Sequence, residues 1–141
     1  SFLMSILMFS GSSKVMIFVS TTDEADFLEA AFLRATYEGP IEGSDEEPEK
    51  MIKHRIYKLH GKVDQKIRSE TYLNFKKSTE GILISTDVAS RGLDFQEVRL
   101  ILQFDPPTSM ADYVNRMGRT ARIGNYGLSL LFLCPHEAAF V

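Results

Sequence analysis

The chain has 141 residues, of which 44% are hydrophobic and 25% charged, as is typical of one globular domain with a sizeable core. A single cysteine excludes an internal disulfide framework and favours a reducing compartment, and the three scattered histidines have no metal-ligand spacing. The apolar run over residues 1–9 is about half the roughly 20 residues of a membrane-spanning helix, and no basic segment precedes it. We therefore expect neither a membrane anchor nor a secretory signal, and a chain that begins with Ser1 is expected to be a fragment.

The net charge of −3 is unevenly distributed. Residues 38–49 carry six acids and no base, so the rest of the chain holds 13 acids against 16 bases. The body of the domain is thus mildly basic, with a net charge of +3. This balance is compatible with phosphate binding but does not establish it.

The first predicted element is a strand over residues 15–19, because its continuous apolar run is typical of a strand buried on both faces of a parallel sheet. Residues 20–22 are Ser-Thr-Thr, which suit the N-cap of a helix. The helix that follows ends near Tyr37 and has one predicted apolar face, formed by Phe27, Leu28, Ala31 and Phe32. Residues 38–50 combine acids with glycine and proline, so they are predicted to form a surface loop.

The remaining elements continue to alternate. Strands are predicted over residues 55–59, 82–85, 98–104 and 127–134, helices over residues 63–77 and 109–117, and a final helix from about Pro135. The first of these helices has an apolar or small residue at every fourth position, namely Val63, Ile67, Thr71 and Phe75. With a short helix between the third and fourth strands, the order indicates an α/β fold in which a parallel sheet has helices on both faces.

In such a sheet, ligands bind beyond the carboxyl ends of the strands. The segments that follow the predicted strands contain hydroxyls at residues 20–22, glycine amides such as that of Gly61, and the stretch of residues 86–94. Hydroxyls, backbone amides and arginines are the groups that hold phosphate oxygens. The sequence therefore predicts a phosphate site at this edge of the sheet.

Three arginines, Arg116, Arg119 and Arg122, are the sharpest feature of this edge. Their spacing of three would place them on one face of a continuing helix, but Gly118 leaves presentation from a loop equally open. The alternative to a phosphate site is a solvated surface on which these arginines pair with acids such as Asp94, Asp105 or Asp112.

Five segments resemble, in order, conserved regions of DEAD-box RNA helicases. Three segments resemble the fourth, fifth and sixth motifs, namely MIFVST (residues 16–21), STDVASRGLDF (85–95) and YVNRMGRTARIG (113–124). The region after the fourth motif is resembled by LHGKVDQKIR (59–68), and the connector before the sixth by QFDPPTSMADYV (103–114). The resemblance covers nearly the whole chain outside the acidic loop. It implies that residues 1–141 form a C-terminal, second RecA-like domain with an acidic surface loop at about 38–50.

In that family, ATP binds between two RecA-like domains, and the phosphate-binding loop and the acid pair belong to the first domain. The resemblance implies that Arg119 and Arg122 reach the γ-phosphate as arginine fingers, which stabilise charge on the transferring group. Gly92 would let the backbone approach the nucleotide, and Asp94 would accept a hydrogen bond from the ribose. Without the family, the alternative for Asp94 is the cap of a helix or a turn. Mg²⁺ would be held mainly by the first domain, so no metal ligand is assigned here.

The resemblance also implies an RNA surface on the same edge. Thr86 and the Gly61 amide would contact phosphates, and Arg91 would link the RNA and ATP sites. Contacts to phosphates or ribose hydroxyls would also come from Ser20, Thr21, Gln65, Arg68 and Asp87. Because these groups read the backbone, we expect little sequence preference. The alternative for Gln65 and Arg68 is a solvated helix face, and for His60 a turn residue bonded to its own backbone.

Two features depart from the family pattern. Asn115 stands where the sixth motif has His, and Asn cannot carry a proton charge. The acidic loop, together with the C-terminal LFLCPHEAAFV (residues 131–141), resembles a nucleolar subgroup that acts in large ribosomal subunit assembly. That subgroup implies ribosome biogenesis and a nucleolar location, with the cytoplasm as the alternative.

Three functions follow as hypotheses. The first is half of an ATP-dependent RNA helicase, which would be a monomer and inactive without its first domain. The second is a helicase-like RNA- or protein-binding module that has lost hydrolysis, which Asn115 favours. The third is a related translocase that acts on DNA, which the segment TDVASRGLD disfavours.

Overall fold

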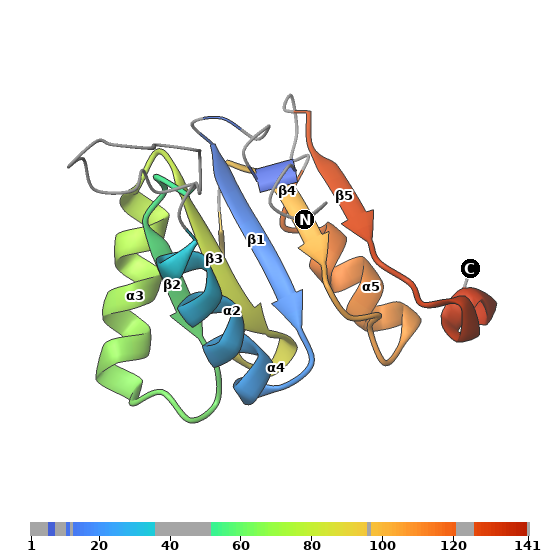
Figure 1. The fold of residues 1–141 in the computed structure, drawn as a ribbon. Coiled ribbons are helices and arrows are strands. Elements are labelled where there is room, and N and C mark those ends of the chain that lie inside the picture. Colours follow the sequence, from blue (N-terminus) through green and yellow to red (C-terminus); the bar gives the residue numbers. More distant parts are fainter. Residues whose placement is uncertain are drawn as a thin grey trace.

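The structure, a computed structural model, describes residues 6–7, 11, 13–35, 52–95, 97–120 and 126–140. It contains one five-stranded parallel sheet with the strand order β2-β3-β1-β4-β5 (Figure 1). The predicted α/β fold with a parallel sheet is confirmed, and the predicted loop at 38–50 lies outside the described residues. In chain order the elements are β1 (Lys14–Val19), α2 (Thr22–Arg34), β2 (Ile56–Leu59), α3 (Gln65–Lys77), β3 (Gly81–Thr86), α4 (Asp87–Ser90), β4 (Val98–Gln103), α5 (Met110–Met117), β5 (Leu128–Leu131) and the 3-10 helix η1 (Pro135–Phe140).

The two central strands are buried on both faces. Every residue of β1 and β3 is buried, which agrees with their continuous apolar sequences. Odd-numbered residues of β1, such as Ile17, pack with α2, whereas Met16 and Phe18 pack with Phe75 of α3 on the opposite face. Helices therefore cover both faces, as predicted, and the core lies in two layers that flank the sheet (Figure 1).

The apolar face of α2 differs from the prediction. Ala25, Leu28 and Phe32 are buried, whereas Phe27 is 70% exposed and Ala31 is also exposed. The spacing of three and four residues between Ala25, Leu28 and Phe32 keeps them in one narrow stripe of the helix. Phe27 lies roughly 200° around the axis from Ala25, so it points away from the sheet. The predicted face was wrong at Phe27 and Ala31.

The predicted face of α3 was also only partly correct. Phe75 is buried, but Ile67 is 54% exposed. A repeat of four residues drifts by about 40° at each step of an α-helix, so residues twelve apart no longer share a face. The helix begins at Gln65 rather than residue 63, because the Asp64 side chain accepts a hydrogen bond from the Lys66 amide at 2.8 Å and caps it there.

The C-terminal part contains less regular secondary structure than was predicted. The strand predicted over residues 127–134 pairs with β4 only over Leu128–Leu131, and the final helix is a 3-10 helix. No helix in the described part of the chain is long and apolar enough to cross a membrane.

Candidate functional site

The strand ends bring three predicted RNA contacts together. Val19 of β1 pairs with Thr86 of β3, and Leu59 of β2 pairs with Ser85, so the three adjacent strands end at nearly the same level. Ser20, Gly61 and Thr86 therefore lie along one edge of the sheet. Ser20 and Gly61 are exposed, whereas Thr86 is 7% exposed. This arrangement agrees with the prediction that polar groups after the strands converge.

Thr21, another predicted RNA contact, has a structural role at the start of α2. Its hydroxyl oxygen accepts a hydrogen bond from the Glu24 amide at 3.1 Å, and the Glu24 carboxylate accepts one from the Thr21 amide at 2.8 Å. This reciprocal capping box satisfies two backbone donors that would otherwise have no partner in the helix. The hydroxyl also donates to the same carboxylate at 2.9 Å, so it is already engaged within the domain.

Asp105 lies beside this cap, just beyond the end of β4. Its carboxylate accepts a hydrogen bond from the Ser20 amide at 2.7 Å, which ties the end of β1 to the end of β4. Burial raises the pKa of Asp105, and the nearby Glu24 carboxylate raises it further, while the Ser20 amide acts in the opposite direction. The edge therefore contains two close carboxyl groups next to the predicted RNA contact at Ser20.

Arg116 is buried, with an exposed fraction of 1%, and it lies at the centre of the site. Its guanidinium donates to both carboxylate oxygens of Asp87, at 2.8 and 2.7 Å, and to the backbone oxygen of Asp105 at 2.7 Å. It also lies over the Phe18 ring, 5.1 Å from the centroid, which places α5 on the same face of the sheet as α3. The alternative of a solvated arginine paired with Asp94, Asp105 or Asp112 is wrong for Arg116.

The engagement of Asp87 bears on its predicted contact with RNA. Both of its carboxylate oxygens are already held by one guanidinium, and its side chain is 24% exposed. Such a bidentate pair fixes the orientation of both groups. Asp87 thus holds α5 against the start of α4, a role that its place in the sequence did not indicate.

Arg91 is anchored differently. Its side chain is 66% exposed, and its guanidinium lies 3.2 Å from the Asp112 carboxylate. Hydrogen bonds from Ser109 and Thr108 lower the pKa of Asp112, and Arg91 contributes to the same shift. The contact between Arg91 and Asp112 joins the segment after α4 to the first turn of α5. Because it is solvent-exposed, this pair is easily exchanged for a contact with another anion.

Arg119 is presented from a turn and not from a helix. α5 ends at Met117, with Gly118 as its C-cap, so Arg116 and Arg119 do not share one helical face. The Arg119 guanidinium donates a hydrogen bond to the Leu93 backbone oxygen. This contact places Arg119 beside Gly92 and Asp94, the two other residues predicted at the nucleotide. Arg122 lies outside the described residues.

The segment with Gly92 and Asp94 is open at Gly92 and is held by hydrogen bonds to its backbone. Gly92 has a φ of +77°, which favours glycine, and no atom lies within 4 Å of where a Cβ would be. The Asp94 backbone oxygen accepts a hydrogen bond from the Tyr72 hydroxyl at 3.1 Å, which fixes the segment to α3. A ligand could thus approach the Gly92 backbone closely.

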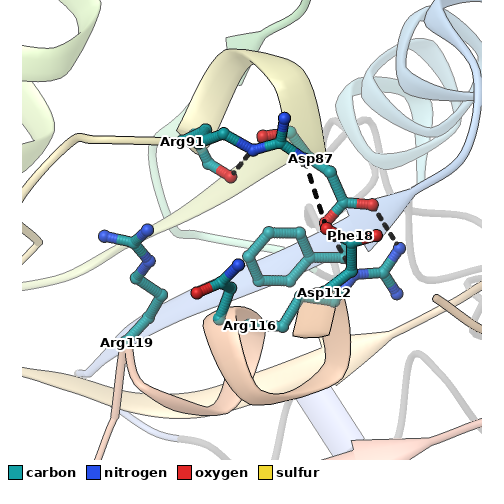
Figure 2. A pocket seen from close by; sticks show the side chains of 8 residues that line it. Phe18, Asp87, Arg91, Asp112, Arg116 and Arg119 are labelled. Atoms are coloured by element: carbon teal, nitrogen blue, oxygen red, sulfur yellow. Dashed lines mark hydrogen bonds and ion pairs between the residues drawn. The ribbon is translucent and has the colours of Figure 1, made fainter. Parts of the chain in front are cut away.

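A small depression lies between these groups. Figure 2 shows Asp87, Arg91, Asp112, Arg116 and Arg119 around it. Its volume is about 10 Å³, which is room for about one water molecule. A nucleotide therefore cannot be enclosed by these residues alone and would need a second surface opposite them.

The remaining predicted contacts lie after β2. Gln65 and Arg68 are in the first turns of α3, where the Gln65 side-chain oxygen is 3.4 Å from the Arg68 guanidinium. His60 is buried, and its Nε2 lies 3.1 Å from the Asp26 carboxylate. The alternative in which His60 bonds to its own backbone is therefore wrong. Its Nδ1 has no hydrogen-bond partner among the described residues.

Residues 23–26 spell Asp-Glu-Ala-Asp, the letters after which the DEAD-box family is named. Here they form the first turn of α2. Asp23 lies 3.3 Å from Lys62, Glu24 completes the capping box, and Ala25 is buried in the core. The Asp26 carboxylate holds Lys58 at 2.7 Å. Since these acids stabilise the helix and its contact with β2, the tetrapeptide is not the acid pair of an ATP site.

The described residues contain no group of three or more histidines, cysteines or carboxylates that could hold a metal ion. Among the predicted site residues, Asp87 is held by Arg116. The Asp87 carboxylate is therefore already paired, and no cluster of three such ligands marks a metal site among the described residues.

Residues 1–124 match the family model described as "Helicase conserved C-terminal domain". The chain is 41% identical over 130 residues to "DEAD-box ATP-dependent RNA helicase 17" of Oryza sativa subsp. japonica, a match that covers 92% of this chain and 22% of the relative. It is 36% identical over 142 residues to "ATP-dependent DNA helicase DDX31" of Homo sapiens, covering 100% of this chain and 17% of that protein. The chain thus spans about a fifth of the length of these relatives.

Among solved structures, the domain is similar to "Mss116p DEAD-box helicase domain 2 bound to an RNA duplex", with a TM-score of 0.76 and 33% identity. That similarity covers 99% of this chain and 49% of the solved one. The fold, the family model and the relatives agree with the segments that resembled DEAD-box motifs. The chain belongs to the helicase conserved C-terminal domain family and is a DEAD-box type, second RecA-like domain.

Proposed function

We propose that this domain completes the ATP site of an ATP-dependent RNA helicase whose first RecA-like domain supplies the rest. In this function Arg119 and Arg122 contact the γ-phosphate as arginine fingers. Gly92 and Asp94 bind the ribose side of the nucleotide. The Mg²⁺ ion, which supplies charge neutralisation at the phosphates when bound, is held by the first domain.

The contact between Arg119 and the Leu93 backbone carries this proposal. It joins the turn after α5 to the loop after α4, which are 26 residues apart in sequence. A guanidinium is thereby held beside an open glycine and a carboxylate. The guanidinium can bind a phosphate, the glycine lets a ligand approach the backbone closely, and the carboxylate can accept a hydrogen bond from a ribose hydroxyl. The depression at this place is too small for a nucleotide, which supports a site shared with another domain.

The RNA surface runs along the same edge. Ser20, Gly61 and Thr86 follow three adjacent strands, and Arg91 lines the same depression as Arg119. In the proposed mechanism ATP and RNA bind between the two domains, and closure gives a continuous RNA surface on which one strand is bent and its partner is displaced. The proposed RNA contacts are Ser20, Thr21, Gly61, Gln65, Arg68, Thr86, Asp87 and Arg91.

The test uses the full-length protein, in which Arg119→Ala and Arg122→Ala are compared with the wild type. Loss of an arginine finger should lower RNA-stimulated ATP hydrolysis by about 10³-fold or more while circular dichroism stays unchanged. Arg34→Ala is the control, because Arg34 is exposed in the last turn of α2, at the opposite end of that helix from Thr21. Normal turnover in either of the first two variants contradicts the finger assignment.

Two other functions are tested by the same preparation. Asn115 is exposed and borders the depression, and it favours a binding module without hydrolysis. Such a module would bind RNA but show no ATP turnover in the wild type.

One relative is named a DNA helicase, so unwinding is compared on RNA and DNA duplexes of the same sequence. Preference for DNA would contradict the RNA assignment.

The cellular role rests on the resemblance to the nucleolar subgroup. The proposed role is in ribosome biogenesis, with the first RecA-like domain of the same protein and RNA as partners. Fluorescence microscopy of the tagged full-length protein should show it in the nucleolus. A cytoplasmic distribution would remove the support for this role but leave the ATP site intact.

A further inference from the structure

β2 lies at one edge of the sheet, and its outer side has no strand beside it among the described residues. Its inner side pairs with β3, where the Ile82 amide donates to the Arg55 oxygen at 2.9 Å. Backbone groups of successive residues in a strand point to alternate sides, so those of Ile56 and Lys58 face outward. An edge strand of this kind presents unpaired N–H and C=O groups to any segment that can lie along it.

A groove of about 230 Å³ lies over this edge and is lined mainly by residues of α2, β2 and α3. These two helices pack on opposite faces of the sheet (Figure 1). Ile56 and Lys58 of β2 form its floor, Glu29 of α2 lies on one wall, and Ile67 and Thr71 of α3 lie on the other. Ile67 is 54% exposed there. An apolar side chain open to a groove beside unpaired backbone is the combination that binds an extended peptide.

The two cations of the groove, Lys58 and Arg55, differ in their partners. The Lys58 amino group is held by two carboxylates, at 2.7 Å by Asp26 and also by Glu29. The Arg55 guanidinium instead lies over the Tyr57 ring, 5.2 Å from its centroid, and forms no ion pair within the described structure. Among the described residues, the cation at the end of the groove therefore has no acidic partner, and it is complementary to a carboxylate.

From these three observations we infer that the groove binds an extended segment of a partner protein, which pairs with β2 as a sixth strand. The segment carries an acidic side chain opposite Arg55 and an apolar side chain against Ile67. Single-stranded RNA fits the groove less well, because Lys58 is neutralised and only one cation is open to phosphates. The groove also runs beside β2, whereas the proposed RNA contacts follow the carboxyl ends of the strands.

The test uses the full-length protein and a fluorescent peptide of about seven residues, in which valine and threonine alternate around one central aspartate. Fluorescence anisotropy should show saturable binding. Arg55→Glu and Ile67→Asp should each weaken it about tenfold or more, since they reverse the charge and remove the apolar contact. Lys66→Glu makes the same charge change at an exposed position of α3 outside the groove, and it should leave binding unchanged.

Hydrogen exchange gives a second readout. The outward amides of Ile56 and Lys58 should exchange rapidly in the free protein and become protected when the peptide binds. The inference is overturned if the peptide does not bind, or if it binds equally well to Arg55→Glu and Ile67→Asp. Slow exchange of both amides without peptide would also overturn it, because another part of the same chain would then cover the edge. If single-stranded RNA displaces the peptide from the wild type but does not displace it from Arg55→Glu, the groove would be assigned to RNA.

Discussion

The guanidinium of Arg116 holds both carboxylate oxygens of Asp87, with Nε–Oδ1 and Nη2–Oδ2 distances of 2.8 and 2.7 Å. Asp87 follows Thr86, a proposed RNA contact, and Arg116 precedes Arg119, a proposed ATP contact. The pair therefore fixes the two segments to each other. If one segment moves when its ligand binds, the other must move with it or the buried pair must break.

Arg116→Ala should lower the free energy of unfolding by about 3–5 kcal/mol, because it leaves the Asp87 carboxylate without its buried partner. Arg116→Lys should also destabilise, since an ammonium cannot make the two parallel bonds of a guanidinium. The control is Arg91→Ala, which removes an exposed pair with Asp112 and should cost less than about 1 kcal/mol. Urea denaturation measures all three, and equal losses at Arg116 and Arg91 would contradict the structural role of Arg116.

Gly92→Ala should destabilise the domain by about 1–2 kcal/mol, because the φ of +77° is unfavourable for a residue with a Cβ. The surroundings are open, so backbone strain and not a clash is the cause. Gly92→Asn should cost less than Gly92→Ala, since asparagine tolerates this conformation better. Gly61→Ala is the matched control, for Gly61 is equally open without a positive φ. In thermal melts, a Tm of Gly61→Ala that is lower than the Tm of Gly92→Ala would contradict backbone strain at Gly92.

Thr21→Ala should lower stability by about 1 kcal/mol, because it removes the oxygen that accepts the Glu24 amide. Thr21→Ser keeps that oxygen and should restore most of the loss. Urea denaturation separates this capping role from the proposed RNA contact, which is measured by RNA affinity. A Thr21→Ala variant with unchanged stability would show that the capping box contributes little.

The central strands could be predicted from sequence because β1 and β3 are short, mostly apolar runs bounded by polar residues. β1 and β3 differ from the prediction by one residue at one or both ends, and the cap at Ser109 was predicted correctly. The helix faces were harder, because whether Phe27 or Ala25 faces the sheet depends on a rotation that the sequence of one amphipathic helix leaves open. The convergence of hydroxyls and arginines at one edge followed from the parallel order alone.

The role of Arg116 could not be predicted, since its partner Asp87 is 29 residues away and no local pattern joins them. In the sequence, Arg116 is one of three evenly spaced arginines. Only packing separates it from Arg119, because Arg116 faces Phe18 within the last turn of α5 whereas Arg119 lies beyond Gly118. The groove at β2 was also hidden, because its lining comes from α2, β2 and α3, which lie apart in the sequence.

Asp105 provides a pH test of the edge. Burial raises its pKa above the ordinary value of 3.8, so ionisation of Asp105 costs more in the folded than in the unfolded state. That cost is absent at pH values below the unfolded pKa, grows as the pH rises from the unfolded to the folded pKa, and is fully present above the folded pKa. Asp105→Asn removes the charge and keeps an oxygen that can accept the Ser20 amide. The variant should therefore be more stable than the wild type at neutral pH, and the gain should vanish on acidification.

Asp112→Asn is the control for Asp105→Asn, because hydrogen bonds from Ser109 and Thr108 lower the pKa of Asp112. A lowered pKa contributes stability that is present above the unfolded pKa and is lost as the pH falls through the folded pKa. Asp112→Asn should therefore destabilise the domain at neutral pH, with a deficit that shrinks in acid. Urea denaturation of both variants between about pH 3 and pH 7 should give shifts of opposite sign. If Asp105→Asn is the less stable protein at neutral pH, the Asp105 carboxylate is stabilised by its contact with Ser20 more than it is penalised by burial and by Glu24.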